Sequence, residues 1–182
     1  HLRQAELPQQ ALARLRDGLR GPDEGDDRVQ VIEGDLQAFE DVVARLGLLQ
    51  LELGPALLFC PADRPDRYEK AAERADAVIV DLEDAVAPAR KAAARDAMIG
   101  HPLDPDTTIV RVNAFDSGYF ADDLMALGQT GYHTIMVAKA EDPHQLSGLD
   151  RYRVIGLCET ARGVLAAPAL AATKNVVALM WG

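Results

Sequence analysis

The sequence lacks the features that mark membrane and secreted proteins. In its 182 residues no apolar run reaches about 18 residues, the length that a membrane-spanning helix requires. The opening HLRQAELPQQ also lacks the basic and apolar regions of a secretory signal. We therefore expect a cytoplasmic protein without membrane contacts.

Cysteine is scarce, and its spacing excludes the common cysteine-based sites. Cys60 and Cys158 are the only two cysteines, and each stands in an apolar run far from the other. Neither has the close spacing of a zinc knuckle or a redox pair. We expect two buried free thiols, with Cys158 pointing toward covering helices, because side chains alternate along a strand and Glu159 follows it.

Positive charge is in deficit. The chain has 19 Lys and Arg against 29 Asp and Glu, which gives a net charge of −10. Such a surface repels the phosphate backbone of nucleic acids and anionic membranes. The composition therefore argues against nucleic-acid binding, and an anionic ligand would need local basic residues.

The first 54 residues have no catalytic pattern. QQALARLRDGLR and DLQAFEDVVARLGLLQLEL carry apolar residues at intervals of three and four, on either side of the polar linker GPDEGDDR. We expect residues 1–54 to form a helical extension that serves packing or oligomerisation. The composition changes near GPALLFCPADRP, so we place the start of the main domain at residue 55.

From residue 55 to 182, short apolar runs alternate with alanine-rich helical segments. The runs are 56–62, 77–83, 107–113, 133–139, 153–159 and 176–182. This alternation predicts an α/β fold with a parallel sheet covered by helices. A doubly wound sheet and a (β/α)8 barrel both fit. No GxGxxG follows the first run, and polar residues end nearly every run, as at a barrel active site, so we favour the barrel.

Glu159 and Arg111 raise the main chemical question. Glu159 ends the apolar run VIGLC and needs an ionic, hydrogen-bonding or metal partner. Arg111 lies within the run TTIVRVN, and its planar fork suits bidentate capture of a carboxylate. The segment DLED at 81–84 could instead be a solvated turn that caps a helix. We expect the basic residues on the next helical segment to form a solvated face: Arg90, Lys91 and Arg95.

Five motifs in order resemble the citrate lyase beta subunit and its relatives, the CitE-like acyl-CoA lyases of the HpcH/HpaI aldolase superfamily. They are LLFCPADRPDRYEKA, ADAVIVDLEDAVAPARKAAAR, IVRVN, MVAKAE and GLCETARGVL. The resemblance covers residues 56–182 and implies a (β/α)8 TIM-type barrel. The six runs supply six of the eight strands, so we expect a barrel truncated after its sixth strand. Family resemblance also implies a homo-oligomer, commonly a trimer.

The resemblance implies a Mg²⁺-dependent carbon–carbon lyase. Such enzymes cleave a 3-hydroxyacyl thioester of the citryl-CoA, malyl-CoA or citramalyl-CoA type into an acyl thioester and an α-keto acid. Two alternatives stay open: a non-catalytic family member that acts as a subunit or binding module, and a metal-dependent aldolase on free keto acids. The sequence does not specify the acyl chain, or whether CoA or an acyl carrier protein carries it.

The resemblance also implies roles for individual residues. Glu159 corresponds to one of two carboxylates that hold Mg²⁺, the second of which follows the sixth strand in the family. Arg111 corresponds to the residue that binds the keto-acid carboxylate.

Four further residues match positions near these two. Glu83 and Asp84 resemble catalytic carboxylates close to the metal's waters and to the arginine. Arg64 and Lys70 resemble positions near the CoA thioester and its phosphates. The general base is not assigned.

Overall fold

The computed structural model describes Gly54 and residues 56–182. The predicted helical extension over residues 1–54 therefore lies, except for Gly54, outside the described residues, and its boundary with the main domain stays a prediction. No helix in the described part of the chain is long and apolar enough to cross a membrane.

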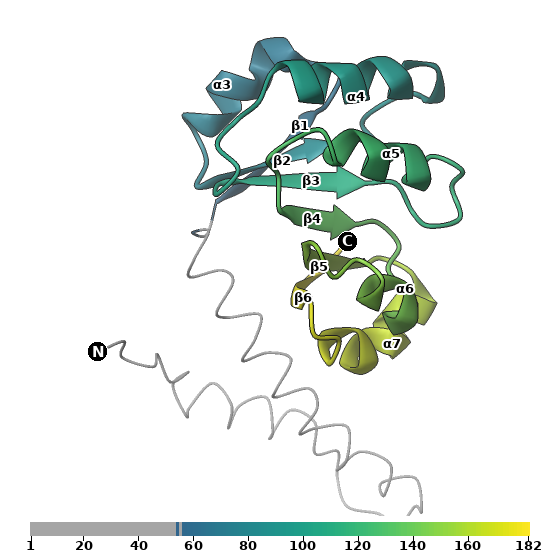
Figure 1. The fold of residues 1–182 in the computed structure, drawn as a ribbon. Helices are drawn as coiled ribbons and strands as arrows, with labels where there is room; N and C mark the ends of the chain where they lie inside the picture. The colour runs from purple at the N-terminus through teal and green to yellow at the C-terminus, as the bar shows by residue number, and fades with distance from the viewer. Residues whose placement is uncertain (1–53, 55) are drawn as a thin grey trace, which may run out of the picture. The chain divides into compact units, whose positions relative to one another are not determined.

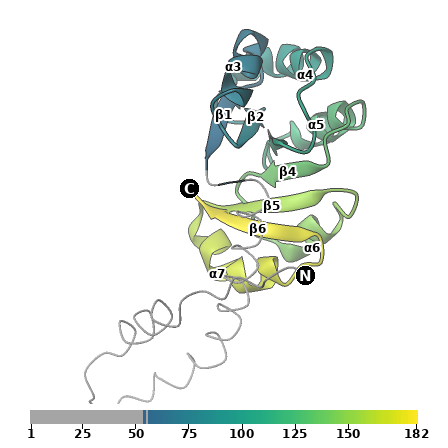
Figure 2. The same ribbon diagram turned by 90° about the vertical axis from the view of Figure 1, so that its left-hand side faces the viewer.

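Six strands form one parallel sheet in the order β1-β2-β3-β4-β5-β6 within the described residues. Their bounds are β1 Leu57–Pro61, β2 Ala77–Asp81, β3 Thr108–Val112, β4 Thr134–Val137, β5 Arg153–Cys158 and β6 Val176–Trp181. Each strand pairs with the next one along the chain, and the sheet curls from β1 to β6 (Figure 1, Figure 2). A doubly wound sheet would reverse its strand order at a switch point. The prediction of barrel-type winding is thus confirmed for these strands.

The crossovers between the strands carry five α-helices. They are α3 Tyr68–Ala72, α4 Lys91–Gly100, α5 Phe120–Leu127, α6 Pro143–Ser147 and α7 Ala161–Ala171, and the 3-10 turns η2 Pro65–Arg67 and η3 Pro88–Arg90 precede the first two. Two helices begin at side-chain caps: Asp142 accepts a hydrogen bond from the His144 amide, and Thr160 accepts one from the Gly163 amide. Such caps satisfy amides that a helix start leaves unpaired.

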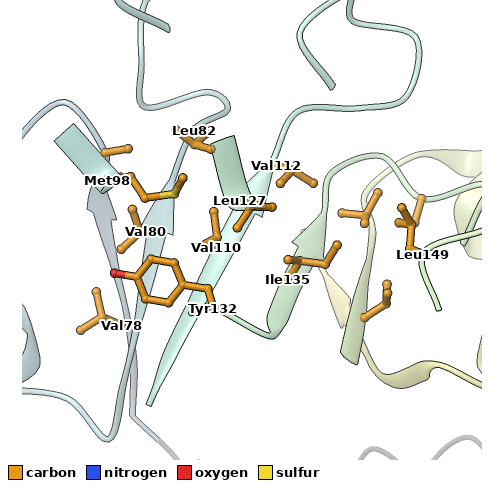
Figure 3. Close-up of a cluster of buried hydrophobic side chains, with 14 of the residues drawn as sticks. Val78, Val80, Leu82, Met98, Val110, Val112, Leu127, Tyr132, Ile135 and Leu149 are labelled. Carbon is orange, nitrogen blue, oxygen red and sulfur yellow. The ribbon is translucent and has the colours of Figure 1, made fainter. Parts of the chain in front are cut away.

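The two faces of the sheet bury separate sets of apolar side chains. The outer set packs the strands against all five helices, and Figure 3 shows part of it, including Val78, Val80 and Tyr132. The inner set includes Ile79, Ile109, Met136, Ile155 and Leu157. Along β2 to β5 the side chains alternate between the two sets, as a sheet covered on one face by helices and curled around the other requires. In β6 the neighbours Val177 and Ala178 both belong to the inner set, where the register between β5 and β6 shifts.

This alternation decides where the polar residues point. In β2, Ile79 lies on the inner face, so Asp81, two residues later, lies there too. In β3, Ile109 lies on the inner face, so Arg111 also lies there. Cys158 belongs to the outer set and is 1% exposed, which confirms its predicted orientation toward the helices. Both cysteines are buried and free, as predicted.

Candidate active site

The centre of the candidate site is an ion pair between neighbouring strands. Arg111 Nε lies 2.8 Å from Asp81 Oδ1, and Arg111 Nη2 lies 2.6 Å from Asp81 Oδ2. The two residues are register partners in the sheet, and the Asp81 side chain is 1% exposed. Arg111 also stacks over the Phe59 ring, with 4.9 Å from Cζ to the ring centroid. Asp81 and the Phe59 ring therefore fix the orientation of the guanidinium.

Asp81 also shapes the turn that follows β2. Its Oδ1 accepts a hydrogen bond from the Glu83 amide at 2.8 Å, and its Oδ2 accepts one from the Ala85 amide at 3.1 Å. These bonds fold the DLED segment back over the end of β2, in the manner of an Asx turn. The Glu83 side chain is consequently carried toward Arg111, with 3.3 Å between Arg111 Nη1 and Glu83 Oε2.

Glu83 connects the arginine to the next two strand ends. Its Oε1 forms a short ion pair with Lys139 Nζ, just after β4. The Lys139 amide donates to Glu159 Oε1 at 2.9 Å, just after β5, and Lys139 Nζ lies 4.0 Å from the same oxygen. We call Asp81, Glu83, Arg111, Lys139 and Glu159 the rim cluster. It joins the carboxyl ends of β2, β3, β4 and β5, where barrel enzymes place their chemistry.

The predicted apolar runs extend beyond some of the strands that they contain. Glu83, Lys139 and Glu159 were placed at the ends of runs 77–83, 133–139 and 153–159, but they follow the strands instead of belonging to them. A charged side chain in the loop can turn toward its partners, whereas one in the strand would be fixed to a single face.

One buried oxygen of the cluster has no hydrogen-bond partner in the structure. Glu83 Oε2 is inaccessible to solvent, and Arg111 Nη1 lies 3.3 Å from it. A buried acceptor left without a donor carries a desolvation cost, which is unusual in a folded protein. Such an atom inside a group of opposite charges is a candidate position for a ligand proton or a water.

Lys91 is buried beneath the DLED turn. The prediction that it lies on a solvated face is therefore wrong for this residue. Its side chain is 6% exposed, and its Nζ lies 2.7 Å from each of three acceptors: the Leu82 and Glu83 carbonyl oxygens and Asn113 Oδ1. An ammonium has three donors, so each finds a partner. Lys91 thereby fixes the backbone that carries Glu83.

Arg95 contradicts the same prediction, whereas Arg90 follows it. Arg95 is 11% exposed and donates to Asp123 Oδ1 at 2.8 Å, while Asp123 Oδ2 accepts from Asn113 Nδ2 at 2.7 Å. Arg90 is 59% exposed and pairs with Asp63. The helical charge run thus has two members in a buried network, because α4 packs against α5 and the end of β3.

Neighbouring negative charges raise the pKa values of the basic residues in the site, whereas burial lowers them. Burial lowers the pKa of Arg111, but the hydrogen bonds and charge of Asp81, with the charge of Glu83, raise it overall. The pKa of Lys139 is raised, chiefly by its hydrogen bond to Glu83. Both groups therefore carry a positive charge at neutral pH. Burial lowers the pKa of Lys91, against the opposing charges around it.

Within the described part, no hydrogen bond or ion pair joins Asp84, Arg64 or Lys70 to the rim cluster. Asp84 and Lys70 are exposed. Arg64 is bound to Asp66 by two hydrogen bonds, 2.9 Å from Nε and 2.8 Å from Nη2. Asp84 is near enough for its charge to contribute to the raised pKa of Arg111.

Glu159 is the carboxylate of the rim cluster best suited to a cation. It is 19% exposed, against 6% for Glu83 and 1% for Asp81. Gly182 packs on it, since a Cβ added there would lie 3.2 Å from Glu159 Oε2. No group of three or more His, Cys, Asp or Glu in the described residues could hold a metal. Mg²⁺ is commonly held by one or two carboxylates, with water and substrate as further ligands, and Glu159 fits that role.

Sequence reasoning assigned no catalytic or binding role to Asp81 or Lys139, and it placed Lys91 on a solvated face. A signal existed for Asp81, because the period of its strand places it inward beside Arg111. Lys139 stands at a strand end, but its double contact depends on a loop conformation. No local pattern distinguished Lys91 from its exposed neighbour Arg90.

Comparison with known proteins gives consistent matches. The sequence model of a family described as HpcH/HpaI aldolase/citrate lyase matches residues 56–182. A citrate lyase subunit beta-like protein of Mycobacterium tuberculosis is 53% identical over 129 residues, which are 71% of this chain and 47% of the relative. A (3S)-malyl-CoA thioesterase of Cereibacter sphaeroides is 32% identical over 136 residues, 70% of this chain and 48% of the relative. The chain spans about half the length of the curated relatives it matches.

Solved structures show the same fold. A crystal structure of the CitE protein of M. tuberculosis in complex with magnesium and acetoacetate has a TM-score of 0.70 and 52% identity, covering 71% of this chain and 54% of that one. Another, with magnesium, acetoacetate and coenzyme A, has the same TM-score and identity and covers 71% and 49%. A citrate lyase beta subunit from the same organism, complexed with oxaloacetate and magnesium, matches equally well, with 58% of its chain covered.

Proposed function

Because the chain belongs to the HpcH/HpaI aldolase/citrate lyase family, we propose that it carries the substrate-binding half of a Mg²⁺-dependent carbon–carbon lyase. The substrate is a 3-hydroxyacyl thioester of the citryl-CoA, malyl-CoA or citramalyl-CoA type, and the products are an acyl thioester and an α-keto acid. The rim cluster carries the proposal: it gathers an arginine and a buried, unpartnered carboxylate oxygen beside a carboxylate that suits a cation.

Arg111 binds the carboxylate of the keto-acid part of the substrate. A guanidinium has five N–H donors, and Asp81 takes two of them, one from Nε and one from Nη2, which leaves three on Nη1 and Nη2. That edge can still form a bidentate pair with a carboxylate. Asp81 is therefore a positioning residue, which turns the free edge of Arg111 toward the substrate.

Glu83 accepts the proton of the substrate hydroxyl at Oε2. This oxygen lies 3.3 Å from Arg111 Nη1 and has no hydrogen-bond partner in the structure. When the proton leaves, the O–H electrons form the ketone, the carbon–carbon bond breaks, and its electron pair moves to the thioester as an enolate. The enolate then takes up a proton to give the acyl thioester.

Glu159 holds Mg²⁺ in this proposal, together with water, substrate and a carboxylate from another part of the protein. When bound, Mg²⁺ polarises the hydroxyl oxygen that becomes the ketone oxygen. Magnesium is present in several solved structures of M. tuberculosis relatives. Asp84, exposed at the same turn as Glu83, serves the water shell of this ion.

Arg64 and Lys70 bind the phosphates of the CoA moiety. Arg64 must release Asp66 to do so, and that exposed pair is weak enough to exchange. A solved relative in complex with coenzyme A supports a CoA thioester in preference to a free keto acid as the substrate. The intact protein is proposed to be a cytoplasmic homo-oligomer, a state that light scattering coupled to gel filtration measures.

Calorimetric titration of Mg²⁺ with oxaloacetate tests the metal and acid assignments. Glu159→Gln should abolish Mg²⁺-dependent binding of oxaloacetate, while Glu73→Gln, an equal charge change at an exposed helix end, should not. Arg111→Gln should abolish oxaloacetate binding, while Arg90→Gln should retain it. Normal binding by Glu159→Gln or Arg111→Gln would remove that residue from the site.

Product analysis with a CoA thioester substrate separates the reaction types. A lyase releases an α-keto acid and an acyl-CoA, whereas a thioesterase, the activity in the name of two relatives, releases the hydroxy acid and free CoA. Turnover of free hydroxy acids alone would indicate an aldolase. Ligand binding without any turnover would indicate a binding module.

A further inference from the structure

Lys139 contacts two carboxylates, that of Glu83 through its side chain and that of Glu159 through its backbone amide. Its ammonium pairs with Glu83 Oε1, and its backbone amide donates to Glu159 Oε1 at 2.9 Å. The ammonium is also 4.0 Å from that Glu159 oxygen. One residue therefore lies between the carboxylate of the proposed proton acceptor and that of the proposed cation ligand.

The backbone of Lys139 adopts a conformation that lysine rarely has. Its φ is +52°, and no other non-glycine residue in the described part has a positive φ. An L residue in the left-handed region is strained, and such strain persists where the surroundings impose it, often at functional sites. Here the turn after β4 directs the amide toward Glu159 while the side chain reaches Glu83.

Lys139 differs from Lys91 in how firmly its ammonium is held. Lys91 is 6% exposed and has three acceptors, so its ammonium is fixed. The Lys139 side chain is 43% exposed, with Glu83 as its hydrogen-bond acceptor. It can leave this position by rotating toward solvent, at little cost in desolvation.

We propose that Lys139 is an exchangeable countercharge, whose ammonium neutralises Glu83 and Glu159 in the metal-free protein and withdraws when a divalent cation binds Glu159. The proposal rests on the assignment of Glu159 as a cation ligand. A cation bound to Glu159 would lie close to the Lys139 ammonium, which is 4.0 Å from Glu159 Oε1. Two positive charges at this range repel each other. Lys139 therefore lowers the cation affinity of the site and keeps the carboxylates in place until the cation arrives.

Binding of Mn²⁺ tests this without any measurement of activity. Mn²⁺ prefers the same oxygen ligands as Mg²⁺, and the loss of its free electron paramagnetic resonance signal reports binding. Lys139→Gln should bind Mn²⁺ about three- to tenfold more tightly than the unmodified chain, an estimate for a partly exposed charge. Lys139→Arg keeps the charge and should bind about as the unmodified chain does.

Lys174→Gln is the matched control. It removes the same charge from an exposed lysine that precedes β6, at the opposite ends of the strands, and should leave Mn²⁺ affinity unchanged. Without cation, Lys139→Gln should have a lower Tm than the unmodified chain, and saturating Mn²⁺ should reduce that difference.

The results separate the two assignments. If the unmodified chain binds Mn²⁺, Glu159→Gln does not, and Lys139→Gln binds no more tightly, the countercharge role is overturned and the metal site stands. Equal tightening in Lys139→Gln and Lys174→Gln would also overturn it. If Glu159→Gln binds as well as the unmodified chain, or no binding occurs, the metal site fails and the countercharge role fails with it.

Discussion

The ion pair between Asp81 and Arg111 makes a quantitative prediction about stability. Asp81→Asn removes the negative charge but keeps the size and one acceptor oxygen of the side chain. Arg111, 12% exposed, would then face an amide that cannot match both of its donors. Its remaining partner would be Glu83, 3.3 Å from Nη1.

The expected loss follows from the burial of the pair. Removing one partner of a buried ion pair costs about 3–5 kcal/mol, because the other charge stays buried without compensation. The retained oxygen and the nearby Glu83 place Asp81→Asn toward the lower end, so we expect the free energy of unfolding to fall by about 3 kcal/mol. The amide group that replaces one oxygen cannot accept a hydrogen bond, so one of the two bonds from the Glu83 and Ala85 amides would also be lost.

Urea unfolding followed by circular dichroism measures the change, with the m-value as a check that the transition is comparable. Asp66→Asn is the matched control, since Asp66 binds Arg64 with the same two-bond geometry but the two side chains are 61% and 42% exposed. Its unfolding midpoint should not move measurably. Equal midpoint shifts in the two variants, or an unchanged midpoint in Asp81→Asn, would refute the argument from burial.

Two further predictions concern packing and pH. Gly163→Ala should destabilise the protein by about 1–3 kcal/mol, because the new Cβ would lie 2.5 Å from the Ala140 carbonyl oxygen, whereas Gly100→Ala, with open space around it, should be neutral or stabilising in the same thermal melt. Similar Tm values for the two variants would contradict the close approach of α7 to the loop after β4. Burial raises the pKa of the Cys158 thiol to about 11, from an ordinary value of 9.0, so the folded state keeps a proton that the unfolded state loses. Stability should therefore fall as pH rises from about 9 to 11, by about 2 kcal/mol from this group at pH 11. Cys158→Ala should flatten that part of the profile of unfolding free energy against pH, and a profile parallel to that of the unmodified chain would show that the thiol does not contribute.

The sequence indicated much of the fold because its main signals are local. Continuous apolar runs predicted buried parallel strands, and polar residues at their ends predicted the edge of the sheet at which the chemistry lies. The period of two along a strand also predicted that Cys158 points outward, and in the structure the same period places Arg111 on the inner face. Strand ends were less certain, since the apolar runs continue into the loops that carry Glu83 and Glu159.

The pairing within the site could not be read from local pattern. Arg111 and Asp81 are 30 residues apart, and Lys139 and Glu83 are 56 apart, so their contacts depend on strand register and loop conformation. Lys91 looked like one of three surface charges, and only the packing of α4 against the end of β3 places it among carbonyl oxygens. Its burial is a property of the assembled layers.

The sequence by itself therefore determined the parallel α/β class, the outward direction of Cys158, and the rim at which charged residues gather. Tertiary structure decided which charge meets which: Asp81 with Arg111, Glu83 with Lys139, and the Lys139 amide with Glu159. The reason is that strand periodicity acts between neighbouring residues, whereas an ion pair requires two distant segments to be held within a few ångströms by everything packed around them.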